Sequence, residues 1–488
     1  MKKKPNLLFI LTDDQGAWAL NCAGNTDIST PNLDHLAEQG MRFDNFFCAS
    51  PVCSPARASI LTGCIPSQHG VHDWIRSGSL DKEKLGEHKD HPYFASEDIP
   101  ISYLDGYVTY PDLLAERGYT CALSGKWHLG DSIRPQHGFS HWYTIGRGGC
   151  MYTQADVIED GKLHFENRYI TDLITEHALQ YLEELSKTDN PFYINIHYTA
   201  PHDPWNADQH PKEFIEMYRD CSFTATPEGP PHPNQIPSAP CGVGEERKRL
   251  LRGYYAAISA MDAGVGKILD KLKDLGLEEN TLVIFTADNG MNMGHHGIWG
   301  KGNGTFPMNL YDTSVKVPFI ARWPGKILPG VVTESMCSHY DIIQTLNELL
   351  DLKATLPENL PGKSFATVLL TGENTDNHIV IFDEYGSSRM IRNREWKYMH
   401  RYPYGPHELY HLITDPGEKE NLIEQLDNLV YREICENLLS ELQKWYLTYA
   451  DPAVDGSREA VTGFGQLLRP GAYSEGKPVY ADIPKSGT

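Results

Sequence analysis

The sequence predicts an α/β fold: a large mixed, mostly parallel central sheet flanked by helices, followed by a smaller C-terminal α+β subdomain with an antiparallel sheet. In the first part of the chain, short apolar runs alternate with helical patterns, which is typical of βα units around a mostly parallel sheet. Near residue 372 the segments become short, alternating and closely spaced, as in an antiparallel meander. We therefore expect one domain over residues 1–372 and a second over residues 373–488.

The individual elements follow from hydrophobic periodicity and from the residues that begin and end helices. Short apolar runs predict strands at Asn6–Leu11, Thr120–Ser124, Pro191–His197, Thr281–Thr286 and Val317–Ala321. Helical spacing, or Pro at the start and Gly past the end, predicts helices at Pro31–Gly40, Tyr110–Gly118, Tyr169–Leu185, Leu250–Leu275 and His339–Leu350. In the second domain, strands are expected at Ile379–Asp383, Ser388–Asn393 and Trp396–Arg401, with a packing helix over Leu422–Tyr446.

Two segments, 71–110 and 200–245, are rich in His, Pro, Gly and charge. We expect them to be long surface loops that contact substrate.

The chain is acidic, with 43 Lys and Arg against 65 Asp and Glu and a net charge of −22. This charge disfavours nucleic acid and anionic membranes as partners, and at first sight also an anionic substrate. No run approaches the roughly 20 apolar residues of a membrane span. The apolar run after Met1-Lys2-Lys3-Lys4-Pro5 is too short for a signal peptide. We expect a cytoplasmic protein, or a periplasmic or secreted one if an export signal has been removed; the oligomeric state stays open.

The ten cysteines are scattered and form no CxxC pair. This pattern argues against a disulfide framework and favours a reducing compartment.

Carboxylates follow two of the predicted buried strands. The first strand runs directly into Asp13 and Asp14, and the strand Thr281–Thr286 is followed by Asp288 and Asn289. Ligands of open α/β sheets bind at the carboxyl ends of parallel strands, and hard divalent cations prefer such oxygen ligands. The alternative is that these residues only cap turns.

A second feature is Cys53 at the start of a predicted helix that continues through Ala58–Leu61 and ends at Gly63. The helix N-terminus favours anions, and Arg57 lies one turn along the same face. A cysteine-dependent phosphatase would have its Arg six residues after the Cys, where this chain has Ser59. The alternative to a reactive role is a small buried core residue.

The stretch Cys53-Ser54-Pro55-Ala56-Arg57, followed by Ala58-Ser59-Ile60-Leu61-Thr62-Gly63, resembles the signature of the type I sulfatases of the alkaline phosphatase-like superfamily. Further matches, in order, are Pro5-Asn6 with Thr12-Asp13-Asp14-Gln15, Gly125-Lys126-Trp127-His128-Leu129-Gly130, Ala200-Pro201-His202-Asp203-Pro204, Thr286-Ala287-Asp288-Asn289-Gly290, Gly297-Ile298-Trp299-Gly300-Lys301-Gly302 and Glu408-Leu409-Tyr410-His411-Leu412 with Asp415-Pro416. The resemblance implies an alkaline phosphatase-like fold, with the catalytic site in residues 1–372.

The resemblance also implies that a formylglycine-generating maturation enzyme converts Cys53 to formylglycine, whose hydrate is the nucleophile. The metal, Ca²⁺ rather than Mg²⁺, would be held by Asp13, Asp14, Asp288 and Asn289, together with the modified residue 53.

Five more residues receive roles by the same resemblance. Arg57 would orient the formylglycine, and Lys126 and Lys301 would contact sulfate oxygens. His128 would accept the proton of the diol, and His202 would bind sulfate and help protonate the leaving alcohol. The ordinary alternatives are solvated surface charges for the two lysines and a buried core histidine for His128.

We therefore expect a sulfatase that hydrolyses O-sulfate esters, with a small sulfated sugar as substrate cleaved at a chain end. The acidic exterior limits the size of the partner, while the cations of the site accept a single sulfate. Two alternatives stay open: a phosphate or phosphonate ester hydrolase of the same superfamily, and a non-catalytic anion- or glycan-binding homologue with unmodified Cys53.

Two aromatic or histidine-rich spots have weaker interpretations. The pair His295-His296 lacks a Cys or Glu nearby to complete a zinc site, and we expect it in a substrate loop. Trp205 and Trp299 are expected to pack in the core rather than stack on a sugar.

Overall fold

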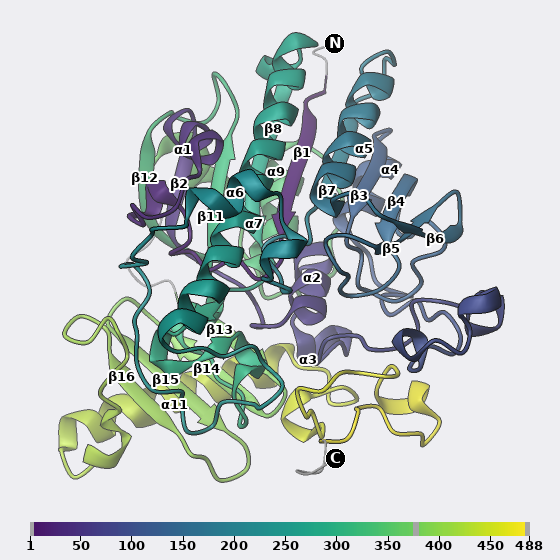
Figure 1. The fold of residues 1–488 in the computed structure, drawn as a ribbon. Coiled ribbons are helices and arrows are strands. Elements are labelled where there is room, and N and C mark those ends of the chain that lie inside the picture. The colour runs from purple at the N-terminus through teal and green to yellow at the C-terminus, as the bar shows by residue number, and fades with distance from the viewer. Residues whose placement is uncertain (1–3, 374–379, 484–488) are drawn as a thin grey trace.

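The computed structural model describes residues 4–373 and 380–483 (Figure 1). Its largest sheet has ten strands in the order β12-β2-β11-β8-β1-β7-β3-β4-β5-β6. Their bounds are β1 Asn6–Thr12, β2 Met41–Phe47, β3 Thr120–Gly125, β4 Phe139–Ile145, β5 Ala155–Glu159, β6 Lys162–Glu166, β7 Phe192–His197, β8 Thr281–Ala287, β11 Lys316–Arg322 and β12 Val331–Ser338. The middle of the sheet, from β8 to β4, is parallel, whereas β11, β5 and β6 pair antiparallel. The predicted large mixed sheet is confirmed.

Helices cover both faces of this sheet, because its central strands are apolar on both sides. Along β1, Leu7, Phe9 and Leu11 belong to one core, and Leu8 and Ile10 belong to the other. The first core is closed by α2 Cys53–Thr62, α4 Tyr110–Glu116, α9 Ile342–Leu349 and α10 Ala366–Thr371. The second core is closed by α1 Pro31–Glu38, α5 Ile170–Leu185 and α7 Gly244–Asp274. Burying each such side chain contributes about 1.5–3 kcal/mol.

The other α-helices and strands before the C-terminal sheet are short. They are α3 Pro66–His69, α6 Lys212–Met217, α8 Asp312–Val315 and the ribbon of β9 Asn292–Met293 with β10 Trp299–Gly300.

A second, antiparallel sheet follows in the order β13-β14-β15-β16, at Ile381–Tyr385, Ser388–Arg392, Trp396–Arg401 and Glu408–His411. The helix α11 Leu429–Tyr449 packs on it, with Leu438 and Leu442 in a core shared with the strands. This confirms the small antiparallel sheet and its helix; Ile379, where the first strand was expected to begin, lies outside the described residues. The domain boundary near residue 372 stays a prediction.

The helix α11 begins later than predicted. The expected start at Leu422 is wrong, because Leu422–Gln425 form a separate 3₁₀ turn. The side chain of Asn428 accepts a hydrogen bond from Val430 N and caps the helix at that point. Conversely, α7 starts at Gly244, six residues before the apolar pattern begins at Leu250.

The first expected surface loop is only partly on the surface. Most of residues 71–80 are buried, because the segment after α11 folds back over them. The side chain of Gln466 accepts hydrogen bonds from the backbone of His72 and Asp73 and donates one to Gly70 O. Figure 1 shows this yellow C-terminal segment beside the dark blue loop after α3.

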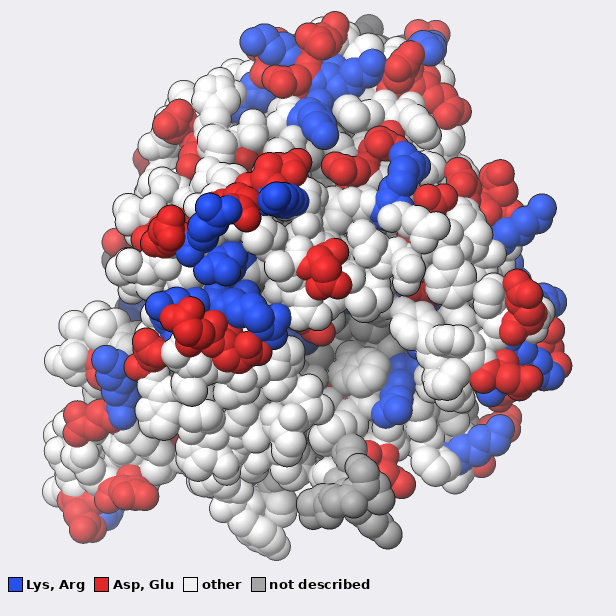
Figure 2. All heavy atoms as spheres, viewed as in Figure 1, with Lys and Arg blue, Asp and Glu red and all other residues white. Residues whose placement is uncertain are grey.

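The surface mixes both signs of charge. On the face shown in Figure 2, most basic side chains lie beside acidic ones. Within the part of the chain that the structure describes, no helix is long and apolar enough to cross a membrane. All ten cysteines are free thiols, as the absence of a disulfide framework predicts.

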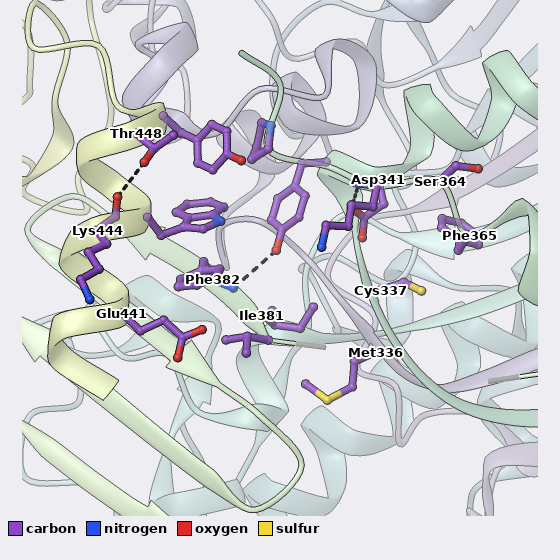
Figure 3. Close-up of a pocket in the computed structure, with 16 residues that line it drawn as sticks. Met336, Cys337, Asp341, Ser364, Phe365, Ile381, Phe382, Glu441, Lys444 and Thr448 are labelled. Atoms are coloured by element: carbon purple, nitrogen blue, oxygen red, sulfur yellow. Dashed lines mark hydrogen bonds between the residues drawn. The ribbon is translucent and has the colours of Figure 1, made fainter. Parts of the chain in front are cut away.

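A cavity of about 630 Å³ lies between the large sheet and the C-terminal sheet (Figure 3). It is lined by Phe382 of β13, by Glu441 and Lys444 of α11, and by Asp341. The Asp341 carboxylate accepts the backbone N–H of Ser338 and Lys363, and burial raises its pKa to about 7. None of the residues that line this cavity belongs to the predicted active site.

Candidate active site

The two carboxylate-bearing strand ends lie side by side, because β1 and β8 are parallel neighbours with Thr12 opposite Ala287. The backbone N–H of Asp288 donates to Thr12 O over 3.0 Å, and that of Asp14 donates to Asp288 Oδ1 over 3.1 Å. Carboxylate oxygens of Asp13, Asp14 and Asp288 lie within 4.8 Å of one another, and all three residues are buried. The structure thus brings together the carboxylates that the sequence predicted.

Two lysines balance this buried negative charge. Lys126 Nζ donates to Asp13 Oδ2 over 2.6 Å, and Lys301 Nζ donates to Asp14 Oδ1. Burial alone would raise the pKa of Asp13 and of Asp14, but Lys126 and Lys301 lower both pKa values below the ordinary range. The alternative of two solvated surface lysines is therefore wrong: both side chains are buried.

Arg57 pairs with the third carboxylate. Its Nε donates to Asp288 Oδ2 over 2.9 Å, and its Nη1 donates to Lys126 O over 2.9 Å. Beside it lies His197, whose Nδ1 is 2.8 Å from the same carbonyl oxygen. Burial and then Arg57 hold the pKa of His197 well below its ordinary value.

His197 was not among the predicted site residues. The sequence feature that could have identified it is its position at the end of the predicted strand Pro191–His197. In the structure it lies opposite Leu11 of the neighbouring β1.

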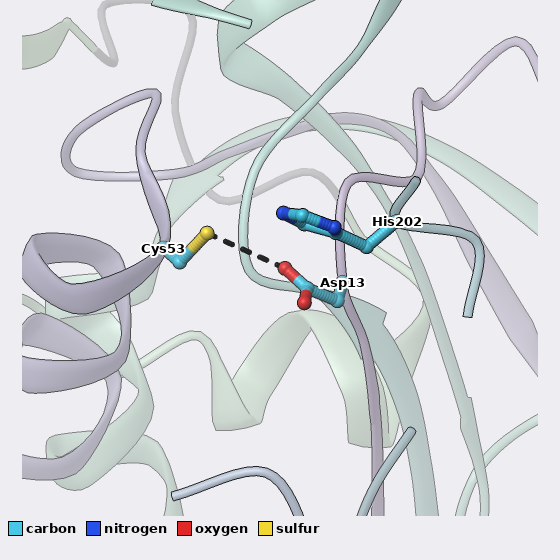
Figure 4. Close-up of side chains that lie close together, drawn as sticks. All are labelled: Asp13, Cys53 and His202. Atoms are coloured by element: carbon cyan, nitrogen blue, oxygen red, sulfur yellow. Dashed lines mark hydrogen bonds between the residues drawn. The ribbon is translucent and has the colours of Figure 1, made fainter. Parts of the chain in front are cut away.

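Cys53 begins α2 and lies directly against the cluster. Its Sγ is 3.4 Å from Asp13 Oδ1 and accepts a hydrogen bond from Lys301 Nζ. Figure 4 shows Cys53 and His202 lying on either side of the Asp13 carboxylate. Burial and then Asp13 raise the pKa of the Cys53 thiol well above its ordinary value. The unmodified side chain is therefore held as a neutral thiol, which is a weak nucleophile.

The two predicted catalytic histidines are in opposite electrostatic environments. His202 Nε2 lies 3.7 Å from Asp14 Oδ2; burial opposes its charged form, but Asp14 and then Asp13 raise its pKa above the ordinary value. For His128, burial and then Lys126 hold the pKa well below the ordinary value. The carboxylates thus favour the cationic form of His202, whereas burial and Lys126 favour the neutral form of His128.

The hydrogen bonds of His128 define which ring nitrogen is free. Its Nε2 is 2.9 Å from Ile75 O, an acceptor, so Nε2 bears the proton and Nδ1 does not. Nδ1 is buried and has no hydrogen-bond partner. Gly148 lies against the ring so closely that an added Cβ would be 1.9 Å from Nε2.

These groups face a cavity of about 600 Å³, a size suited to a small organic ligand. Its lining includes Cys53, His128, His202 and Lys301, together with residues of the predicted loop 71–110.

The second expected loop contributes less to this cavity. Ser238 is the lining residue from the part of segment 200–245 that follows His202.

The donor set fits a hard divalent cation. Asn289 donates from Nδ2 to Asp14 Oδ1, while its Oδ1 is buried without a hydrogen-bond partner. An unpaired buried amide oxygen beside three carboxylates is the kind of ligand that Ca²⁺ binds. Asp13, Cys53 and His202 form a second group of close ligand atoms in the same place.

Two weaker expectations have different outcomes. His295 lies against Trp18, His296 stacks on Tyr311 with ring centroids 4.0 Å apart, and neither lines the cavity. Trp205 and Trp299 are both 3 % exposed and pack in the core as expected.

Comparison with known proteins agrees with this geometry. The sulfatase family model matches residues 5–352, and the model of the N-sulphoglucosamine sulphohydrolase C-terminal region matches residues 294–446. N-acetylglucosamine-6-O-sulfatase of Bacteroides thetaiotaomicron is 26 % identical over 91 % of this chain and 87 % of its own length. N-acetylgalactosamine-6-sulfatase of Mus musculus is 30 % identical over 78 % of this chain and 68 % of its own.

Solved structures share the fold. One, of a protein in complex with its substrate D-glucosamine-2-N,6-O-disulfate, has a TM-score of 0.75 at 23 % identity, covering 94 % of this chain and 100 % of that one. The phosphonate monoester hydrolase of Agrobacterium radiobacter has a TM-score of 0.67 at 22 % identity, covering 91 % of this chain and 96 % of that one. At these identities the likeness shows the fold alone. The family model matches most of the sequence, and the chain therefore belongs to the sulfatases, a family of sulfuric ester hydrolases.

Proposed function

We propose that this enzyme removes a sulfate from the end of a sulfated carbohydrate by means of formylglycine at position 53. The observation that most supports this is the place of Cys53: Sγ lies 3.4 Å from Asp13 Oδ1 and next to Lys301 Nζ, at a cavity wide enough for a sugar. The relatives named as N-acetylhexosamine-6-sulfatases support a carbohydrate substrate.

Maturation oxidises the Cys53 side chain from a thiol to an aldehyde, which lowers the mass by about 18 Da. This step belongs to a separate formylglycine-generating enzyme and its electron acceptor. Addition of water then gives a hydrate with two hydroxyl groups at residue 53. The buried neutral thiol is a weak nucleophile, whereas the hydrate offers an oxygen nucleophile and a second hydroxyl for release of the product.

In the proposed reaction, one hydroxyl of the hydrate gives its proton to Asp13, whose Oδ1 lies 3.4 Å from Sγ of the unmodified residue. The oxygen of that hydroxyl attacks the sulfur, and the bond between sulfur and the sugar oxygen breaks. The cationic His202 donates a proton to the leaving sugar oxygen. Nδ1 of the neutral His128 then accepts the proton of the second hydroxyl, which expels sulfate and restores the aldehyde. Lys126 and Lys301 neutralise charge that develops on the sulfate oxygens, and Arg57 keeps residue 53 and Asp288 in place.

Asp13, Asp14, Asp288 and Asn289 would hold the metal, and we propose Ca²⁺ over Mg²⁺, since Ca²⁺ tolerates an irregular oxygen cage. When bound, the cation supplies Lewis-acid polarisation of a sulfate oxygen.

The test is co-expression with a formylglycine-generating enzyme, followed by intact-protein mass spectrometry and assays on an aryl sulfate, an aryl phosphate and sulfated sugars. We expect the mass decrease and preferential sulfate release. The shared fold of the phosphonate monoester hydrolase makes the phosphate arm necessary. A phosphate preference of about tenfold or more, equivalent to about 1.4 kcal/mol, would overturn the proposal. A wholly unmodified Cys53 in protein from its native host would favour the binding homologue.

A further inference from the structure

The wall of the active-site cavity is basic, although the chain as a whole carries a net charge of −22. Among the described residues that line it, none is Asp or Glu, and three are Lys or Arg: Arg76, Arg147 and Lys301. Lys301 is paired with Asp14 and belongs to the sulfate site. The two arginines are not required by the proposed reaction, so their presence in the cavity needs another explanation.

The backbone next to Arg76 is hydrogen-bonded to the active site through Ile75. The N–H of Ile75 donates to Ser54 Oγ over 2.9 Å, and its carbonyl accepts from His128. Arg76 itself is exposed, and its Nη1 donates to Phe464 O over 3.2 Å. Within residues 4–373 and 380–483, no carboxylate forms an ion pair with it. A guanidinium with unused donors therefore stands in the cavity wall, fixed to the backbone that holds His128.

Arg147 lies on another loop and is also the neighbour of a residue that contacts His128. It precedes Gly148, which lies against the His128 ring. Its guanidinium lies 3.3 Å from the centroid of the Tyr93 ring, and its Nη1 donates to Tyr93 O. Its Nε is buried without a hydrogen-bond partner, and Asp156 is 3.9 Å away. The aromatic ring fixes the plane of the guanidinium and leaves Nη2 available to a ligand.

We propose that Arg76 and Arg147 form a second anion subsite, which binds a carboxylate or a further sulfate on the same sugar substrate. Planar guanidinium groups bind such oxyanions through paired N–H donors. Trp74, Tyr93 and Phe464 line the cavity between and beside them and supply apolar faces for a sugar ring. The subsite rests on the proposed sulfatase reaction and specifies its substrate as a sugar with at least two acidic groups.

The test compares three substrates that share one sulfated sugar: the neutral form, a form with a carboxylate, and a form with a second sulfate. The matured wild-type enzyme should favour one of the acidic forms in kcat/KM by about tenfold or more, the size expected for a charge-assisted hydrogen bond. The form that is favoured identifies the anion. Arg76→Met should remove most of this preference and change kcat/KM for the neutral form by less than about twofold.

Further variants separate a binding role from a structural one. Arg147→Lys keeps the charge and should lower kcat/KM on the acidic substrate alone, because the ammonium lacks the planar fork. Arg168→Met, at an exposed arginine outside the cavity, is the matched control and should leave the preference unchanged.

Two results would overturn the subsite: equal kcat/KM for neutral and acidic substrates in the wild type, or equal losses on both in Arg76→Met. These results differ from failure of the proposed function, which would appear as no turnover of any sulfate ester, aryl sulfate included. Turnover of the aryl sulfate without an acid preference removes the subsite alone.

Discussion

Arg57 Nε donates to Asp288 Oδ2 over 2.9 Å, and neither side chain is more than 1 % exposed. Removing one member of a buried ion pair leaves the other charge uncompensated in a low-dielectric environment. Arg57→Met should therefore lower the free energy of unfolding by about 3–5 kcal/mol, as measured by urea denaturation. The control is Arg168→Met, which breaks an exposed pair with Glu176 and should cost about 1 kcal/mol or less. Equal losses in the two variants would contradict the structural importance of the Arg57 pair.

The carboxylate cluster predicts a metal-dependent stability. Ca²⁺ should raise the melting temperature, because the ion binds the folded cluster and not the unfolded chain; at 100 times Kd the gain is about 2.7 kcal/mol. A chelator should reverse the increase, and Mg²⁺ should give a smaller one. Asp14→Asn should lose most of the response, whereas the fully exposed Asp427→Asn should keep it. Absence of any Ca²⁺-dependent shift in the wild type would count against the metal site.

Cys53→Ala should abolish turnover while leaving the fold intact, since only a small side chain at the start of α2 is shortened. Turnover of a sulfate ester measures the effect on catalysis, and the free energy of unfolding measures the effect on the fold. Both are measured on the same preparation. Cys241→Ala, at a partly exposed cysteine before α7, should keep wild-type turnover. Retained turnover in Cys53→Ala would remove the nucleophile assignment.

Local sequence pattern was sufficient to predict the centre of the fold and the carboxylate cluster. A buried strand followed by acidic residues is visible within ten residues, and Asp13 and Asp288 meet because their strands are parallel neighbours. The strand Met41–Phe47 was missed, because apolar and polar residues alternate only over Met41–Asp44 and because it pairs with segments that lie far along the chain.

The burial of the loop after α3 had no local signal at all. Asp73 accepts hydrogen bonds from the Tyr385 hydroxyl over 2.6 Å and from Gly465 N over 3.0 Å, partners more than 300 positions away. A loop of His, Pro, Gly and charge has the composition of an exposed segment, and only the returning C-terminal segment buries it. Composition therefore predicted that this loop contacts the cavity, but not that hydrogen bonds from the end of the chain hold the loop in place.

The contact between the loop after α3 and the C-terminal part of the chain should depend on pH, because the titratable side chain of Asp73 forms it. Burial raises the pKa of Asp73 to about 6, above its ordinary value of 3.8. The folded protein therefore holds this proton more tightly than the unfolded chain does. As the pH rises from about 4 to about 6, the contribution of Asp73 to the free energy of unfolding should fall by about 3 kcal/mol and then stay constant.

The measurement is urea denaturation of wild type and Asp73→Asn between pH 4 and pH 8. The uncharged Asn side chain does not titrate in this range. The free energy of unfolding of the variant, relative to that of the wild type, should therefore increase as the pH rises to about 6 and then stay constant. A difference that is the same at every pH would contradict the raised pKa.

Gly148 is predicted to position His128 by having no side chain. An added Cβ would lie 1.9 Å from His128 Nε2 and 2.3 Å from Cε1, and the ring is already held by the hydrogen bond from Nε2 to Ile75 O. Gly148→Ala must therefore displace the ring from the place where Nδ1 can accept a proton, and kcat for sulfate release should fall by about 100-fold, a typical loss for a general base. Gly229→Ala, at a glycine with no heavy atom within 4 Å of the new Cβ, should leave kcat unchanged. Unchanged kcat in Gly148→Ala would mean that the reaction does not depend on the placement of His128, and the proton would then need another acceptor.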